Sequence, residues 1–392
     1  MDEILSIQGL VVRFYTYEGV VKAIEGVDLF LKEGETLGIV GETGCGKSVT
    51  TLSAMVLTPP PGRIEDGKVL LKTEDGYVNM FELDKERLRK LRSKYMAIIF
   101  QEPGSALNPV YTIGDQIAEG LILHRKEEYC RRALEGLKKE LGDGSSAKSP
   151  LLSMEAKMLE RMLKGDGSRL VGILSHIPVL NRFNKRIYDE AMKDAVNLLR
   201  EMGIPDPERV VKMYPHELSG GMKQRVVIAM ALTGNPKILI ADEPTTNLDV
   251  TVQAQVLELI KRTKELTSSS IIYITHDMGV IAEMCDRVAV MYAGTVCEVA
   301  DVYELFKNPM HPYTKALIES IPRPGAELKS IPGMVPNLIE PPPGCRFHPR
   351  CPHAKRICKE KRPSLKEVKP GHFVACHLYG GGDGSSDKSI RP

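Results

Sequence analysis

The sequence predicts an α/β protein organised around a phosphate-binding loop. Residues 41–48 read Gly-Glu-Thr-Gly-Cys-Gly-Lys-Ser and fit G-x-x-x-x-G-K-[ST], a pattern whose backbone N–H groups cradle phosphates. Short apolar runs, such as Thr36–Val40 directly before the loop and Ile238–Ala241 much later, predict buried strands. Polar residues follow several of these runs, so we expect chemistry at the strand ends.

The bulk properties indicate a soluble chain with more than one structural part. Its 392 residues exceed the usual size of one core, which favours a large domain with an appendage, or two domains. A net charge of +2 predicts no affinity for nucleic acid by itself. No apolar run approaches the roughly 18 residues that cross a bilayer, and the first residues lack the basic region of a signal peptide. We therefore expect a cytoplasmic protein.

Residues 4–32 precede the loop and alternate apolar with polar positions. This alternation predicts two or three antiparallel strands. Tyr17 lies in this region, where its ring could stack on an adenine base, although an exposed tyrosine at a strand end fits the sequence nearly as well.

The loop itself predicts a site for ATP with Mg²⁺. Lys47–Met55 can begin a helix whose positive N-terminal end faces the phosphates. Lys47 is expected to reach the β- and γ-phosphates, and the Ser48 hydroxyl to ligate Mg²⁺. The thiol of Cys45 has no expected catalytic part, but we expect it to be exposed to alkylating reagents. The predicted nucleotide contacts in this segment are Gly41, Glu42, Thr43, Gly44, Cys45, Gly46, Lys47, Ser48 and Val49.

Two later strand ends carry further candidates for the same site. Met96–Phe100 is an apolar run that ends at Gln101, whose amide oxygen could complete the Mg²⁺ shell. The run from Ile238 ends in Asp242 and Glu243. Asp242 is expected to support Mg²⁺, and Glu243 to polarise the water that attacks the γ-phosphate.

A third strand end and a helix start complete the set. Ser270–Thr275 is another strand-like run, and His276 directly after it could hydrogen-bond the γ-phosphate and the attacking water. Ser219-Gly220-Gly221 precedes the apolar helix Val226–Leu232 and could form a second anion site at the helix N-terminus. Taken alone, this turn would be an ordinary helix cap.

In order and spacing, these segments together with Asn247-Leu-Asp249 resemble the ATP-binding subunit of an ABC transporter, over residues from about 4 to about 300. The resemblance implies a P-loop NTPase fold of ABC type, with a mixed sheet core, an antiparallel β subdomain and a helical subdomain. It also implies a head-to-tail pair of such subunits. The signature segment of one subunit would close on the ATP of the other through Ser219, Gly220, Gly221, Gln224 and Asp249.

Further segments resemble the dipeptide and oligopeptide import branch of that family. They include Phe100–Pro109, Tyr214–Met222, His311-Pro-Tyr-Thr314 and Ile331-Pro-Gly333. The resemblance implies ATP hydrolysis that drives peptide import at the cytoplasmic face of the membrane. The implied partners are two membrane permease subunits, a second ATPase subunit and, indirectly, an extracytoplasmic substrate-binding protein, with no nucleic acid. Two departures are Asn247, where alanine is more usual, and an insertion at about 126–186.

Two alternatives stay open from the sequence. Relatives in this branch can move sugars or nickel, and cargo is chosen by other subunits. A non-transport ABC ATPase that acts on nucleic acid or ribosomes usually carries two cassettes or a long coiled-coil insertion. This chain has one cassette and a short insertion broken by glycines, which favours the transporter.

Four cysteines near the C-terminus predict a metal site. Cys345, Cys351, Cys358 and Cys376 lie in a segment with nine Lys or Arg and two Glu, a basic setting expected to lower thiol pKa values and favour ligation. The residues alone support zinc and an iron–sulfur cluster equally, with a disulfide less favoured. The resemblance favours a structural [4Fe–4S] cluster. Nearby histidines keep a mixed zinc site open: His348, His353, His372 and His377.

The predicted domain organisation follows from these assignments. An ABC ATPase domain spans residues 1–305, with a helical subdomain at about 103–236. A C-terminal extension spans 306–379 and carries the four cysteines, and residues 380–392 form a disordered tail.

Overall fold

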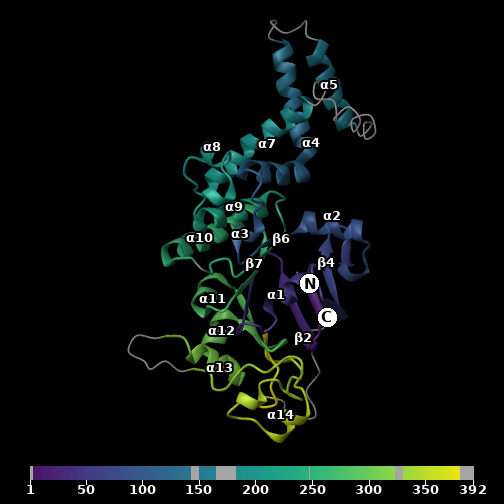
Figure 1. The fold of residues 1–392 in the computed structure, drawn as a ribbon. Helices are drawn as coiled ribbons and strands as arrows, with labels where there is room; N and C mark the ends of the chain where they lie inside the picture. Colours follow the sequence, from purple (N-terminus) through teal and green to yellow (C-terminus); the bar gives the residue numbers. More distant parts are fainter. Residues whose placement is uncertain (1–2, 143–149, 165–181, 247, 323–329, 380–392) are drawn as a thin grey trace. The chain divides into compact units, whose positions relative to one another are not determined.

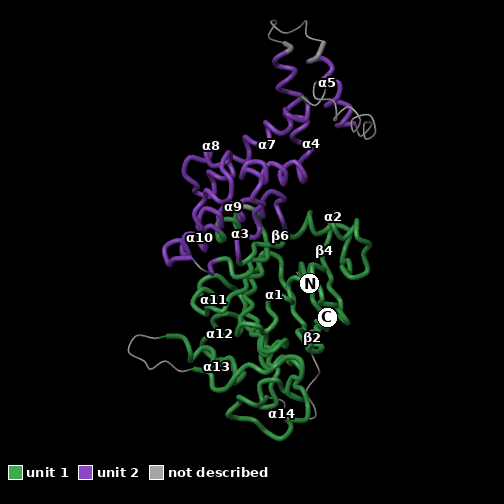
Figure 2. The backbone as a smooth tube through the Cα atoms, viewed as in Figure 1, with its two compact units in different colours: residues 1–101, 237–244, 260–392 green, residues 102–236, 245–259 purple. Residues whose placement is uncertain are grey.

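The computed structural model describes residues 3–142, 150–164, 182–246, 248–322 and 330–379. The chain forms two compact units. Unit 1 comprises residues 1–101, 237–244 and 260–392, and unit 2 comprises residues 102–236 and 245–259 (Figures 1 and 2). Asn247, the tail 380–392 and much of the predicted insertion lie outside the described residues.

Unit 1 contains an eight-stranded mixed sheet in the order β11-β12-β10-β9-β3-β8-β7-β6. Five neighbouring strands run parallel, and four of these match runs expected from the sequence. Their residues are mostly buried, which explains why they read as continuous apolar runs rather than alternating ones. The parallel strands are β3 (Thr36–Val40), β6 (Met96–Ile99), β7 (Ile238–Asp242), β8 (Ser270–Thr275) and β9 (Arg287–Tyr292).

The other three strands of this sheet form an antiparallel edge. β10 (Thr295–Asp301) pairs with β9 on one side and with β12 (His372–Val374) on the other, and β11 (Lys366–Lys369) pairs with β12. The C-terminal extension therefore supplies two strands to the main sheet and is part of the core of unit 1.

A second, four-stranded antiparallel sheet in unit 1 has the order β2-β1-β4-β5. It confirms the antiparallel strands expected before the loop. Its strands are β1 (Glu3–Thr16), β2 (Gly19–Lys32), β4 (Gly62–Thr73) and β5 (Gly76–Asn79). One hydrophobic cluster joins the two sheets, with Leu10 and Ile24 from this sheet packed with Ile39 of β3.

The helices of unit 1 are short and begin at side-chain caps where the sequence offers them. Asp84 caps α2, and Asp277 caps α11 directly after β8. The helices are α1 (Lys47–Ala54), α2 (Lys85–Tyr95), α11 (Met278–Met284), α12 (Val302–Lys307), α13 (Pro312–Glu319) and α14 (Arg356–Glu360), with 3₁₀ turns η1 (Met80–Glu82) and η3 (His348–Arg350).

Unit 2 is helical in its described residues. Helix α4 changes direction at Arg125, which has non-helical backbone angles, just where the predicted insertion begins. Beyond this point α4 packs on α7, and the Asp194 carboxylate accepts hydrogen bonds from Tyr129 and Arg132. The elements are α3 (Pro103–Ala106), α4 (Ile113–Gly142), α5 (Pro150–Leu163), α7 (Arg182–Glu201), α8 (Pro207–Val210), η2 (Pro215–Glu217), α9 (Gly220–Leu232) and α10 (Val250–Thr267), whose last residues belong to unit 1.

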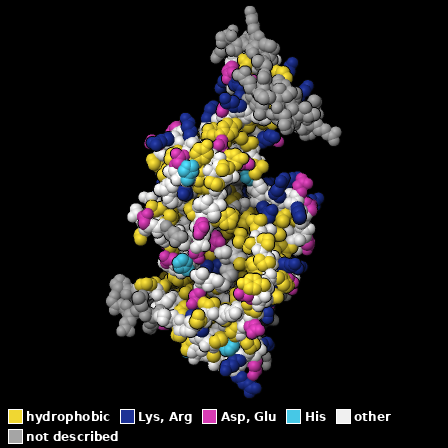
Figure 3. All heavy atoms as spheres, in the orientation of Figure 1, with side chains coloured by type: hydrophobic (Ala, Val, Ile, Leu, Met, Phe, Trp, Pro, Cys, Tyr) yellow, Lys and Arg dark blue, Asp and Glu magenta, His cyan; other side chains and the backbone are white. Residues whose placement is uncertain are grey.

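Two surface properties are visible in the described residues. On the face shown in Figure 3, basic and acidic side chains are interspersed, as the near-balanced charge of the chain predicts. Within the described ranges, no helix is both long and apolar enough to cross a membrane.

Candidate functional site

The phosphate loop, residues 41–48, connects β3 to α1 in unit 1, and two of its glycines cannot carry a side chain. A Cβ on Gly41 would lie 2.1 Å from the carbonyl oxygen of Met291. Gly46 has a φ of +99°, and a Cβ there would lie 2.6 Å from Cδ1 of Ile24. The loop is therefore packed directly against the strands beside it, with glycine required by close approach and by backbone angle.

Lys47 lies over this loop. Its Nζ donates hydrogen bonds to the carbonyl oxygens of Gly41 at 2.9 Å and Glu42 at 3.3 Å. The same Nζ is 3.9 Å from Oε1 of Glu243, so the buried ammonium has a carboxylate partner. The ammonium is thus held at the loop, where a phosphate group could replace these contacts.

Ser48 and Asp242 meet at the carboxyl end of β7. Ser48 Oγ donates a hydrogen bond of 2.9 Å to Oδ1 of Asp242. Burial raises the pKa of Asp242, while the Ser48 hydrogen bond opposes that shift. A hydroxyl and a carboxylate are the oxygen ligands that Mg²⁺ prefers, and Mg²⁺ usually keeps waters and phosphate oxygens as its other ligands. The pair therefore fits the predicted Mg²⁺ position.

Glu243 is held between residues from two neighbouring strand ends. Gln101, after β6, donates from Nε2 to Oε2 of Glu243 at 3.2 Å, and Nδ1 of His276, after β8, lies 3.4 Å from the same oxygen. Glu243 itself has a φ of +46°, and its N–H donates to the Ile274 carbonyl at 2.9 Å. A left-handed backbone at a non-glycine residue is a strain that occurs often at functional sites.

The structure thus brings together six of the predicted residues in unit 1: Lys47, Ser48, Gln101, Asp242, Glu243 and His276. Tyr17 lies in the turn between β1 and β2 and is 97% exposed. Its predicted stacking on adenine stays a prediction.

The expected exposure of Cys45 is wrong. Cys45 is 0% exposed, and burial raises the pKa of its thiol. The reason is the close packing of the loop, because Sγ would lie only 2.8 Å from a Cβ placed on Gly41. Sequence alone places Cys45 in a loop but does not show which face of the loop is covered.

The signature residues lie in unit 2, four of them at the start of α9 and Asp249 directly before α10. Ser219 caps this helix, and its Oγ accepts a hydrogen bond of 3.3 Å from the Met222 N–H. Ser219 and Gly220 are exposed, whereas Gln224 is 1% exposed. Asp249 is exposed and accepts a hydrogen bond from the Val252 N–H at 3.0 Å. The exposed turn could face an anion, but Gln224 points into the interior of unit 2.

The predicted four-cysteine metal site is not supported. In the described parts of the chain, no group of three or more His, Cys, Asp or Glu side chains is arranged to hold a metal ion. The expected lowering of thiol pKa values is also wrong. Burial raises the pKa of Cys345 to about 11, and it raises the pKa values of Cys351 and Cys376. Burial is the largest cause of each of these three shifts.

Sequence reasoning missed two residues that contact the loop, Arg350 and Tyr313. The Glu42 carboxylate pairs with Arg350, which also contacts the Tyr292 hydroxyl, and the Glu42 N–H donates to the Tyr313 hydroxyl. The available signal was the motif His311-Pro-Tyr-Thr314, which contains Tyr313 but does not reveal its partner 271 residues away.

Comparisons with known proteins agree with this geometry. Residues 24–246 match the family described as ABC transporter, and residues 297–358 match the family described as oligopeptide/dipeptide transporter, C-terminal region. The solved dimeric structure of the ATP-binding cassette MJ0796, in a post-hydrolysis state bound to ADP and Pi, has a TM-score of 0.52 at 22% identity. The aligned region covers 76% of this chain and 98% of the MJ0796 chain, and the similarity shows the fold alone.

Similar sequences extend over nearly the whole chain. The dipeptide transport ATP-binding protein DppD of Bacillus subtilis (strain 168) is 42% identical over 382 residues, covering 96% of this chain and 95% of DppD. The oligopeptide transport ATP-binding protein OppD of the same organism is 41% identical, covering 96% of this chain and 89% of OppD. The chain therefore belongs to the ABC transporter family, among the ATP-binding proteins that carry the oligopeptide/dipeptide transporter C-terminal region.

Proposed function

We propose that this chain is the ATP-hydrolysing subunit that powers import of dipeptides or oligopeptides through partner membrane permeases. The near full-length identity to dipeptide and oligopeptide transport ATP-binding proteins carries the proposal. The arrangement of Lys47, Asp242 and Glu243 at the phosphate loop supports the ATPase part.

The site residues of unit 1 have separate roles in the proposed hydrolysis. The loop amides and Lys47 hold the β- and γ-phosphates, and Ser48, Gln101 and Asp242 are the residues that would hold Mg²⁺. When bound, Mg²⁺ offsets the negative charge that develops on the phosphate oxygens.

Glu243 is the proposed general base. Its carboxylate accepts a proton from the water that attacks the γ-phosphorus, while the bond from that phosphorus to the bridging oxygen of ADP breaks. Gln101 and His276 contact Oε2 of Glu243 and hold it in place, and His276 can also contact the γ-phosphate.

The proposed assembly contains two ATPase subunits, related or identical, at the cytoplasmic face of the membrane. The exposed Ser219-Gly220 turn of one subunit would face the nucleotide of the other, since helix N-termini favour anions. Asp249 would lie near the same interface. Two permease subunits and an extracytoplasmic substrate-binding protein complete the importer.

Uptake measurements test the proposal. The chain would be co-expressed with its permeases, its binding protein and its partner ATPase in cells that lack peptide importers of their own. We expect uptake of labelled di- and oligopeptides with the wild-type chain and none with Glu243→Gln. Uptake of nickel or a sugar instead would assign another cargo. ATPase activity that co-purifies with nucleic acid or ribosomes, and not with membranes, would contradict transport.

A further inference from the structure

The C-terminal extension reaches the phosphate loop at Glu42. Arg350, at the end of η3, donates from Nη1 to Oε2 of Glu42 at 2.8 Å and from Nη2 to Oε1 at 3.1 Å. The Arg350 side chain is 4% exposed and that of Glu42 is half-buried. Two parallel charge-assisted hydrogen bonds of this kind are strong and fix the geometry of both groups.

Further hydrogen bonds fix the orientation of the Arg350 guanidinium. Its remaining donors contact the Tyr292 hydroxyl at 3.2 Å and the carbonyl oxygens of Ile331 at 3.3 Å and Pro332 at 2.7 Å. All five N–H groups of the side chain are therefore used. Gly333 follows with a φ of +76°, and a Cβ there would lie 3.2 Å from Cγ of Arg350. These contacts give a physical reason for the Ile331-Pro-Gly333 motif.

The backbone of Glu42 is fixed as well. Its N–H donates to the Tyr313 hydroxyl at 3.0 Å. Tyr313 is fully buried, with its ring centroid 4.6 Å from that of Tyr292 and 5.3 Å from that of Phe347 in the extension. The side chain of Glu42 is thus held by Arg350 and its backbone by Tyr313.

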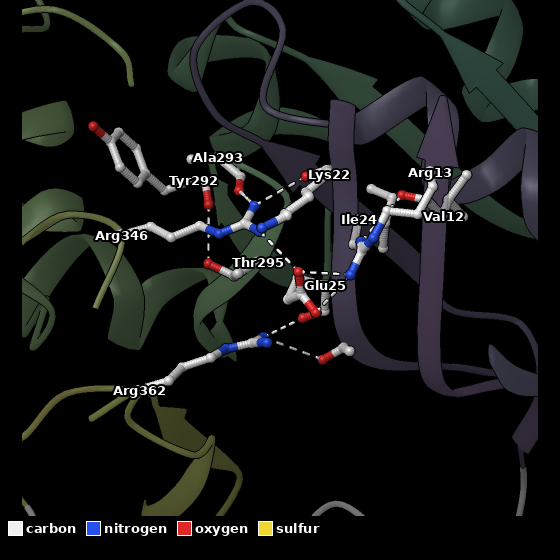
Figure 4. Close-up of polar contacts among 11 residues, drawn as sticks. Val12, Arg13, Lys22, Ile24, Glu25, Tyr292, Ala293, Thr295, Arg346 and Arg362 are labelled. Carbon is white, nitrogen blue, oxygen red and sulfur yellow. Dashed lines mark hydrogen bonds and ion pairs between the residues drawn. The ribbon is translucent and has the colours of Figure 1, made fainter. Parts of the chain in front are cut away.

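A second arginine of the extension, Arg346, contacts β2 and the turn at Ala293 (Figure 4). Arg346 donates to the carbonyl oxygens of Ala293 and Lys22 and to the carboxylate of Glu25. Gly294, next to Ala293, donates its N–H to the Cys45 carbonyl in the loop at 2.8 Å. Burial lowers the pKa of Arg346 to about 10, with Glu25 opposing, so this group remains charged at neutral pH.

We propose that Arg350 is a positioning residue for ATP binding, which acts through Glu42 to hold the phosphate loop in the shape that accepts a triphosphate. The C-terminal extension thereby sets the ATP affinity of the chain. The inference rests on the proposed ATPase function. Without Arg350, the Glu42 carboxylate would be unpaired in a loop that must receive an anion, and it would repel the phosphates.

Binding and turnover measurements on purified protein test this. For Arg350→Ala we expect the Kd of a fluorescent ATP analogue and the KM for ATP to rise about tenfold, with kcat nearly unchanged, because a charged hydrogen-bonded pair is lost. Adding Glu42→Gln to this variant should recover part of the affinity, because the unpaired charge is gone although the contact between the two side chains is still missing. A purely structural role of Arg350 would not produce such recovery.

Arg356→Ala is the matched control. Arg356 lies in the same extension and pairs with Glu360 at 2.8 Å, but it is exposed, so its loss should leave ATP affinity unchanged. If Arg350→Ala does not fold, Tyr313→Phe removes only the hydroxyl that accepts the Glu42 N–H and should also raise the Kd. Wild-type affinity in Arg350→Ala or Tyr313→Phe, or no recovery in the double variant, would overturn the proposal. A wild-type protein that binds no ATP would instead overturn the proposed function.

Discussion

The hydroxyl of Ser48 and the carboxylate of Asp242 form a hydrogen bond of 2.9 Å between residues that are 194 positions apart in the sequence. It joins the first turn of α1 to the end of β7 and so fixes the phosphate loop relative to the strand that carries Glu243. Because β6, β7 and β8 are parallel neighbours, the residues that follow them meet at one edge of the sheet.

Glu243→Gln should retain ATP binding and lose turnover. The amide keeps the size of the side chain but cannot accept the proton of the attacking water. We expect kcat to fall by about 10²–10⁴-fold, the usual contribution of a general base. Steady-state kinetics and binding of a fluorescent ATP analogue would separate the two effects. Glu283→Gln, which alters an exposed carboxylate paired with Lys261, serves as the control. Turnover retained in Glu243→Gln would remove this residue from the catalytic role.

Lys47→Ala should lose ATP binding itself. The buried ammonium is the cation held at the phosphate loop, and alanine would leave the phosphate charge without this partner. Equilibrium binding of the same ATP analogue measures the loss. Lys261→Ala removes a half-buried lysine of α10 that lies outside the loop, and this variant should bind normally. Equal affinity in both variants would contradict the role given to Lys47.

Asp242→Asn should stabilise the nucleotide-free protein near neutral pH. Burial raises the pKa of Asp242, so the folded protein retains this proton at higher pH than the unfolded chain does. Stability from this group is fully present below its ordinary pKa and is lost as the pH rises through the raised value. Asparagine has no charge to bury, so it avoids this loss. The melting temperature of the variant should therefore exceed that of the wild type at about pH 8 and equal it at about pH 4. Asp189→Asn, an exposed site on α7, should change neither midpoint. A variant that melts no higher than wild type at the upper pH would contradict the effect.

Local patterns predicted the strands that lead to the candidate site well, because each reads as an apolar run followed closely by a polar residue. The strands of the extension were not foreseen, since Lys366–Lys369 and His372–Val374 are short and partly polar, and only pairing with β10 makes them part of the sheet. The pair Arg350 and Glu42 spans 308 residues and leaves no local signal. Charge counting also misjudged Cys345, Cys351 and Cys376, because burial raises the pKa values of these thiols. Iron, zinc and acid-labile sulfide assays on protein purified without oxygen test the cluster prediction directly.

Cys45 should resist alkylation in the native protein whether or not ATP is present. The side chain is covered, and burial raises the pKa of its thiol, so little thiolate is available to react. Mass spectrometry after a brief treatment with iodoacetamide would show label at Cys45 only when the protein is first unfolded. If Cys45 of the native protein were labelled, and ATP prevented this labelling, the thiol would be exposed, as the sequence suggested.

Glu298→Ala should destabilise unit 1 by about 3 kcal/mol or more, because each buried donor left without an acceptor costs about 1–3 kcal/mol. Glu298 is 0% exposed and accepts the N–H groups of Met310 and His311, each at 2.8 Å. Its Oε1 also lies 2.7 Å from Nε2 of His372 in β12. Alanine would leave these groups buried without an acceptor. Urea unfolding would measure the change, with the exposed Glu360→Ala as control.

The same substitution distinguishes a general loss of stability from a loss confined to the extension. Glu298 joins β10 to His372 of β12 and to the residues that begin α13, the helix that carries Tyr313. If the extension holds the phosphate loop through Tyr313 and Arg350, then loosening it should weaken ATP binding at urea concentrations where unit 1 remains folded. Equal unfolding midpoints for Glu298→Ala and wild type would show that the buried carboxylate does not stabilise the fold. A lower midpoint with unchanged ATP affinity would show that the extension can loosen without disturbing the loop.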